Sequence, residues 1–416
     1  MTSTPDHSAL QRRTLTVLII TQVLGTVGVG IAPSIGILLA EDVTGNEALA
    51  GLARTSSTLG AALFGLPLGT LAARHGRRFA LSLGWLTAAL GSALLVAAAQ
   101  NSLVVALFAG LLLIGAGSAA SLQSRFAATD LAEPHHRARA LAFVVWVGTV
   151  GSVLGPNLGV PGSVVGSWLG LNVYAGAFGI ATVCMAGAAV VVVALLRPDP
   201  LLVLRRESSS SDGVSVRPGR RPGRFAAIGF AAIGVELRTN PRARYAVTAI
   251  LTAQVVMVAV MTMTPVHIAH HGGSITLVGI TISLHVLGMF ALSPLVGWFA
   301  DRFGHRVSIG LGLLVLLASL VTGALWPDSM RAVVVCLFLL GLGWSFVSVA
   351  GSALFATVIA DDHRAAAQGG VDALANLCGA VAALGSGPLL VATNFSVLSL
   401  VAVVALVPLA VVTLRG

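Results

Sequence analysis

The sequence GTLAARHGRR at Gly69–Arg78 returns later in the chain as GWFADRFGHR at Gly297–Arg306. Each copy follows one long apolar segment and precedes another, so the two copies occupy equivalent places in two halves. A second, weaker repeat relates GSVLGPNLG at Gly151–Gly159 to LGSGPLL at Leu384–Leu390. Repeats of this kind predict two structurally related halves.

The composition excludes a water-soluble globular protein. Of the 416 residues, 56% are hydrophobic and 9% are charged, and the mean hydropathy is +0.95. About a quarter of the residues in a soluble domain are charged. Apolar runs of roughly 20 residues, long enough to cross a ~30 Å hydrocarbon layer, recur along the whole chain. We therefore predict an all-α integral membrane protein with about twelve transmembrane helices in two halves of six.

A polar segment separates the two groups of apolar runs. Residues 1–197 form the first half, residues 198–243 a basic linker rich in Pro, Gly and Ser, and residues 244–416 the second half. The linker cannot bury enough apolar surface to pack as a domain. The predicted spans are 15–39, 50–72, 79–99, 103–127, 139–161, 172–196, 245–268, 275–299, 307–326, 332–359, 366–392 and 396–414.

The net charge of +9 comes from arginine, because all 24 basic residues are Arg. Most of them lie in alternate loops and in the linker, and by the positive-inside rule this places both termini and the linker in the cytoplasm of a bacterial inner (plasma) membrane protein. No aromatic stacking platform accompanies them, which argues against a nucleic-acid partner. We expect a monomer whose partners are the lipid bilayer and a small-molecule or metal-ion substrate. The other loops hold Arg54, Arg331, Glu41, Asp42, Glu47 and Asp328.

The repeated loop resembles the signature G-x-x-x-D-R-x-G-R-R of the major facilitator superfamily, which lies between the second and third spans. The resemblance covers nearly the whole chain and implies a secondary transporter that alternates between outward and inward openings, with no enzyme activity and no cofactor. Ala73 stands where the family usually has Asp, so a latch between the halves would rest on other contacts. The residues of this gating motif are Gly69, Arg74, Gly76, Arg77, Arg78, Gly297, Asp301, Arg302, Gly304 and Arg306.

A second motif lies in the fifth predicted span. Gly151, Gly155, Pro156 and Gly159 resemble the G-x-x-x-G-P-x-x-G motif associated with drug/proton antiporters of the same superfamily. Small residues at this spacing also let two membrane helices approach closely, whatever is carried. Because a similar run occurs in the second half, we favour helix packing and a hinge over an antiporter signature.

Ionisable residues at membrane depth are few. Arg125 and Asp130 lie at the inner end of the fourth span, and Asp372 lies near the inner end of the eleventh. Residues of this kind are candidates for proton coupling or substrate contact. The alternative, which we favour, is that each pairs with a neighbour at the cytoplasmic edge.

The remaining candidates are soft metal ligands. Met257 and Met261 are four residues apart on the seventh span, and His285 and Met289 are four apart on the eighth. Each pair therefore lies on one helix face near the bilayer midplane. Thioether sulfurs and a neutral imidazole suit a soft metal such as Cu(I). The alternative is that the methionines fill gaps in the core and the histidine bonds across helices.

These two pairs resemble the CcoA-like copper importers, a branch of the superfamily recognised by M-x-x-x-M in the seventh span and H-x-x-x-M in the eighth. The resemblance implies copper uptake, with Cu(I) as substrate and not as cofactor. His267, His270 and His271, at the outer end of the seventh span, would collect the metal or form only a hydrated turn. Members grouped with this branch are also linked to riboflavin uptake. Transport of an organic solute, either riboflavin uptake or proton-coupled multidrug efflux, is therefore the alternative.

Overall fold

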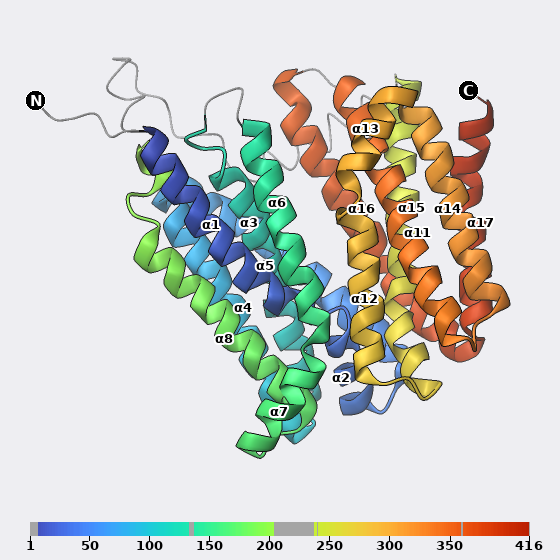
Figure 1. The fold of residues 1–416 in the computed structure, drawn as a ribbon, viewed down its shortest axis with the longest axis horizontal. Coiled ribbons are helices and arrows are strands. Elements are labelled where there is room, and N and C mark those ends of the chain that lie inside the picture. The colour runs from blue at the N-terminus through green and yellow to red at the C-terminus, as the bar shows by residue number, and fades with distance from the viewer. Residues whose placement is uncertain (1–6, 133–136, 204–236, 239, 359–360, 416) are drawn as a thin grey trace, which may run out of the picture. The chain divides into compact units, whose positions relative to one another are not determined.

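The computed structural model is built from helices and short connections, with no β-strand among the residues it describes (Figure 1). Eleven helical segments of this described part are long and apolar enough to cross a membrane. The predicted all-α membrane fold is confirmed. The structure describes residues 7–132, 137–203, 237–238, 240–358 and 361–415.

The fifth predicted span, residues 139–161, is not among the eleven continuous segments. Its residues belong to α6 (Arg137–Leu154), the short 3-10 helix η3 (Gly155–Asn157) and the start of α7 (Gly159–Leu169). Pro156 follows Gly155 in the 3-10 turn, where the proline has no N–H to donate to the preceding helix. The Gly-Pro motif therefore divides this span into two helices.

The helices form two compact units. The first unit comprises residues 1–32 and 59–222, and the second comprises residues 33–58 and 223–416. The predicted linker, residues 198–243, lies mostly outside the described residues.

The first unit packs around a buried indole. Trp85 of α4 is fully buried, and a Cβ added to Gly25 of α1 would overlap its ring. α4 packs against α5 and α8, and α1 packs against α6 and α8. Small residues at such contacts allow the close helix approach on which association in a membrane depends. The helices of this unit, besides α6, η3 and α7, are α1 (His7–Gly30), most of α3 (Ala50–His75), α4 (Arg77–Asn101), α5 (Val104–Ala127) and α8 (Val173–Leu195).

The second unit is arranged around α15, which packs against α11, α12 and α14 (Figure 1). α17 covers α11 and α14, and α16 packs against α11. The elements of this unit are α2 (Ile35–Thr44), η1 (Glu47–Leu49), the first residues of α3, α11 (Pro241–His270), α12 (Ile275–Phe290), α13 (Ser293–Phe303), α14 (His305–Leu325), α15 (Met330–Val358), α16 (Asp361–Ala392) and α17 (Phe395–Arg415).

Residues 33–58 belong to the second unit, although they lie within the predicted first half. A turn at residues 31–34 separates α1 from α2, and residues 35–40 of α2 are buried. Thr55 donates a hydrogen bond to the Ala380 carbonyl of α16 at 3.0 Å. A Cβ added to Gly51 would lie 3.2 Å from the carbonyl carbon of Ala383. Close backbone packing therefore fixes this segment, the 33–58 segment, on α16.

Candidate substrate site

His285 lies fully buried on α12, as the sequence predicted for a residue deep in a span. Its Nδ1–H donates a hydrogen bond to the Leu337 carbonyl of α15 at 2.8 Å, because a carbonyl can only accept. In the neutral ring, Nε2 is then an acceptor. This atom is buried and has no hydrogen-bond partner among the described residues, methionine sulfurs included. The site therefore contains an unpaired acceptor.

Arg54, on the first turns of α3, belongs to the same unit and acts electrostatically on the His285 ring. Its Nε is also buried and has no hydrogen-bond partner in the described part of the chain. A buried cation is costly unless an acceptor or an opposite charge compensates it. Arg54 supplies a donor and His285 an acceptor, so a ligand that has both kinds of group would satisfy the pair.

Aromatic and amide groups lie on the neighbouring helices. The Trp344 Nε1–H of α15 donates to Gln254 Oε1 of α11 at 3.1 Å. The Trp344 ring meets Phe290 of α12 edge-on, with the centroids 5.9 Å apart. Gln254 also lies against α16, since a Cβ added to Gly379 would be 3.4 Å from its Nε2. α11, α12 and α15 thus present both aromatic surface and hydrogen-bonding groups.

The sequence prediction missed Arg54, Gln254 and Trp344. Arg54 was counted among the loop arginines, although it lies on a helix. The signal for Gln254 was present, because an amide side chain in an apolar span needs a partner. No sequence pattern indicates that this partner is the indole of Trp344.

The predicted methionine ligands are all buried. The exposed fractions of Met257, Met261 and Met289 are 3%, 5% and 8%. The face of α12 that carries His285 lies against α15, since a Cβ added to Gly288 would be 2.8 Å from the Phe338 carbonyl oxygen. The convergence of the sulfurs on the imidazole therefore stays a prediction.

Two of the three predicted capture histidines make contacts of their own. The buried His267 ring stacks on Phe395 of α17, with the centroids 4.4 Å apart, and its Nε2–H donates to the Pro327 carbonyl at 2.7 Å. The Nδ1–H of His271 donates to the His267 carbonyl at 2.9 Å, and its Nε2 lies 3.3 Å from Asp328. These contacts hold the end of α11, and metal capture stays a prediction.

The third of these histidines, His270, lies beside acidic side chains. Its Nε2 contacts the Glu41 carboxylate, and its Nδ1 lies 3.4 Å from Glu47 Oε1. Both carboxylates belong to the 33–58 segment. His270 therefore joins the end of α11 to that segment.

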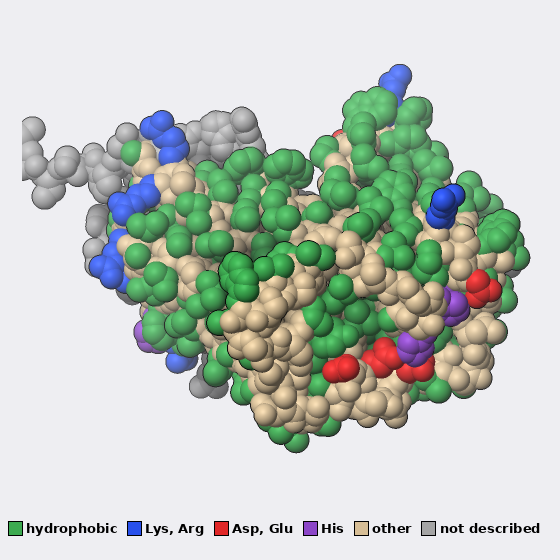
Figure 2. All heavy atoms as spheres, turned by 60° about the horizontal axis from the view of Figure 1, so that its bottom comes forward, with side chains coloured by type: hydrophobic (Ala, Val, Ile, Leu, Met, Phe, Trp, Pro, Cys, Tyr) green, Lys and Arg blue, Asp and Glu red, His purple; other side chains and the backbone are tan. Residues whose placement is uncertain are grey.

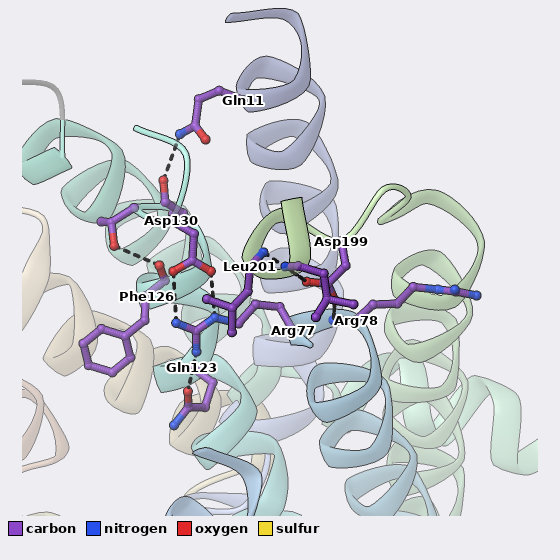
Figure 3. A network of polar contacts seen from close by, with 11 residues as sticks. Gln11, Arg77, Arg78, Gln123, Phe126, Asp130, Asp199 and Leu201 are labelled. Atoms are coloured by element: carbon purple, nitrogen blue, oxygen red, sulfur yellow. Dashed lines mark hydrogen bonds and ion pairs between the residues drawn. The ribbon is translucent and has the colours of Figure 1, made fainter. Parts of the chain in front are cut away.

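The first copy of the repeated loop contains a charged network (Figure 3). The guanidinium of Arg77 donates to both carboxylate oxygens of Asp130, at 2.8 and 3.1 Å, and to Gln123 at 3.0 Å. This bidentate pair supports the structural role favoured for Asp130. Arg125 is half-buried near the end of α5, and Asp372 is exposed on α16. A coupling role for any of the three stays a prediction.

The two loop copies share one backbone geometry. Gly76 has a φ of 93° and precedes α4, and Gly304 has a φ of 91° and precedes α14. This region of φ favours glycine because a Cβ would clash with the backbone. Asp199 accepts the Arg78 backbone N–H at 2.7 Å beside Gly76 (Figure 3), whereas Arg306 donates to the Thr413 carbonyl at 3.0 Å beside Gly304. The repeat therefore has a structural basis.

The other residues of the loop motif differ in exposure. Arg74, Asp301 and Arg302 are exposed, whereas Gly69 and Gly297 are half-buried on their helices. A gating role for the motif stays a prediction.

The glycines of the Gly-Pro motif lie in tight helix contacts. A Cβ added to Gly151 would be 2.7 Å from the Val27 nitrogen of α1, and one added to Gly155 would be 2.6 Å from the Val27 carbonyl oxygen. Gly159, at the start of α7, is also buried. These approaches support the packing role of the motif.

The two helical units, the repeated loop and the buried polar groups together define the class of a polytopic membrane transporter. Sequences of the Major Facilitator Superfamily match residues 17–273 and 246–415. The chain belongs to this superfamily and is a transporter, not an enzyme. The predicted superfamily and transporter class are confirmed, and the copper branch stays a prediction.

Two relatives and one solved structure extend this result. The chain is 36% identical over 402 residues to the uncharacterized MFS-type transporter YdeG of Bacillus subtilis (strain 168), covering 96% of this chain and 91% of YdeG. It is 30% identical over 372 residues to the riboflavin transporter RfnT of Brucella anthropi, covering 87% and 85%. The crystal structure of the nucleoside transporter NupG superposes with a TM-score of 0.74 at 15% identity, covering 97% and 99%. At that identity, the likeness to NupG shows the fold alone.

Proposed function

We propose that this transporter takes up a planar, polar heteroaromatic solute of the riboflavin class and binds it beside Arg54 and His285. The carrying observation is the pair of buried atoms without partners, a donor on Arg54 and an acceptor on His285. A ring system in which N–H donors and carbonyl acceptors alternate can pair with both. The similarity to RfnT, a riboflavin transporter, supports the same class.

The energetics favour such a solute over a purely apolar one. A buried donor or acceptor without a partner costs about 1–3 kcal/mol, and this cost is relieved when a ligand pairs with it. A site built in this way rejects analogues that lack one hydrogen-bonding group. Trp344 and Phe290 add aromatic surface for a planar ring, and Gln254 adds an amide.

Cu(I) is the second candidate. The unpaired Nε2 of His285 is a suitable ligand atom, and its Nδ1–H is held by a backbone carbonyl, as is usual for metal-binding histidines. The buried Met257 and Met261 would supply soft sulfur. The charge of Arg54 counts against this candidate, because two positive charges repel strongly at low dielectric.

In this proposal the protein works as a monomer in the bacterial plasma membrane by alternating access. The arginine distribution supports a cytoplasmic location for both termini and for the linker. Solute then enters from the side on which the loops carry Glu41, Glu47 and Asp328.

Uptake assays in one set of cells separate the two candidates. Cells that cannot make riboflavin would express the wild type, Arg54→Gln, His285→Phe or the double variant Met257→Leu/Met261→Leu, with Met185→Leu, a buried methionine of the first unit, as a matched control. We expect labelled riboflavin to accumulate with the wild type and with both methionine variants, and to fall at least about tenfold with the other two. Accumulation of radioactive copper that depends on Met257 and Met261, without riboflavin uptake, would replace this proposal by the copper one.

A further inference from the structure

His270, the last residue of α11, lies between two carboxylates of the 33–58 segment. One ligand atom from each of His270, Glu41 and Glu47 lies within 4.8 Å of the others. Acidic and histidine side chains gather on the face of the molecule seen in Figure 2. The exposed fractions of the three side chains are 40%, 21% and 38%, so protons of the surrounding water reach them.

The geometry of this cluster counts its protons. Glu41 lies at Nε2 and Glu47 at Nδ1, so each ring nitrogen faces a carboxylate. A neutral imidazole has one donor and one acceptor, and an ionised carboxylate only accepts. Both contacts are therefore hydrogen bonds only if the ring is an imidazolium or one carboxyl group is protonated. Either state contains the same one additional proton.

The surroundings favour a positive ring. His270 is at the C-terminal end of α11, where the helix dipole stabilises a cation. The other titratable groups near it are His267 and His271 on the same helix, Asp328 in the turn before α15, and Asp42 on α2. The two histidines have their own hydrogen-bond partners, so the carboxylates of the 33–58 segment face His270.

Loss of the proton weakens the attachment of the 33–58 segment. A neutral His270 donates to one carboxylate only, and the lone pair of its second nitrogen then faces the negative charge of the other. The segment is continuous with the first unit at Ala32 and at Leu59, whereas its own packing is with α16 and α11 of the second. A transport motion of one unit against the other would pull on this attachment.

We propose that His270, Glu41 and Glu47 form a proton-binding site that holds the 33–58 segment on the second unit when loaded and releases it when the proton leaves. The site makes the transport cycle responsive to the pH of the solution that it faces. It does not depend on which solute is carried.

Hydrogen–deuterium exchange of the purified full-length protein tests the site without any solute. Exchange in peptides from the 33–58 segment would be compared between the wild type and His270→Gln at about pH 5.5 and about pH 8.5, on either side of the range in which histidine titrates. We expect exchange about threefold slower in the wild type at the lower pH, and equal in the two proteins at the higher pH. Peptides of α4 serve as the internal control.

Two further variants make the test specific for charge. His270→Lys keeps a positive charge at both pH values, so we expect it to protect the segment at both. Glu41→Gln removes one negative charge and should abolish the pH-dependent difference. Equal exchange in the wild type and His270→Gln at the lower pH overturns the proposal. A difference that a chelator removes would also overturn it, because the ligand would then be a metal ion.

Discussion

The Nδ1–H of His285 donates to the Leu337 carbonyl, and the opposite ring nitrogen has no partner among the described residues. The first contact ties α12 to α15 and fixes which nitrogen carries the proton. The second fact leaves a hydrogen-bond acceptor, or a metal ligand, in the interior of a membrane protein. One buried side chain thus has a structural contact on one edge and an open functional valence on the other.

Replacing His285 by Phe keeps a ring of similar volume and removes both nitrogens. We expect riboflavin binding to the purified protein to weaken about tenfold or more, because the solute loses its partner at Nε2. Titration calorimetry measures this change. The control is His75→Phe, at an exposed ring of the first unit. Unchanged affinity in His285→Phe would show that the solute does not contact this histidine.

The contact between α12 and α15 depends on a small residue at Gly341. A Cβ there would lie 3.1 Å from the carbonyl carbon of His285 and would overlap its oxygen, both of which are backbone atoms. We expect Gly341→Ala to lower the free energy of unfolding by about 1–3 kcal/mol. Gly385→Ala on α16 is the matched control, since a Cβ there meets nothing within 4 Å. Thermal unfolding in detergent compares the two, and equal midpoints would contradict the prediction.

Gly76 has a positive φ of 93°, and a Cβ there would overlap the Asp199 carboxylate. We expect Gly76→Ala to destabilise the first unit by about 1–3 kcal/mol, since it adds backbone strain and displaces the carboxylate that caps α4. In Gly179→Ala, at a helical position where a Cβ meets nothing within 4 Å, stability should be unchanged or slightly raised. Proteolysis rates of the two variants provide the measurement, and the prediction is wrong if they are equally resistant.

The bidentate pair of Arg77 and Asp130 is mostly shielded from water, with exposed fractions of 14% and 10%. Asp130→Asn removes the charge and should lower the unfolding free energy by about 1–3 kcal/mol, since the guanidinium loses its charge-assisted bonds. Asp301→Asn, at an exposed position of the second loop copy, should have little effect. Thermal unfolding of both variants tests this, and a larger loss in Asp301→Asn would reverse the assignment.

The sequence predicted the features that arise from periodicity and local backbone geometry. The helical spans follow from apolar runs, and the turns at Gly76 and Gly304 follow from the repeated loop. The burial of His285 follows from its depth in an apolar run. The choice of its neighbour does not, because spacing along a helix shows which residues share a face but not which helix covers that face.

The candidate site was only partly predictable for the same reason. Met257, Met261 and Met289 were predicted to be at depth and are buried, yet the contacts of the His285 ring are with α15. Arg54 reaches this site because the start of α3 belongs to the second unit. That grouping depends on long-range packing of residues 33–58 against α16, which no local pattern in the sequence specifies.

The position of residues 33–58 also sets where the chain can be divided. A cut in the linker yields two polypeptides, but the C-terminal one lacks α2, η1 and the start of α3, which complete its own unit. The N-terminal polypeptide would carry the missing piece as an uncovered apolar segment with Ile35, Ile37 and Leu39 on it. Two such fragments, produced together, would assemble through this piece in the manner of split-protein complementation, and neither would be a stable half-transporter alone.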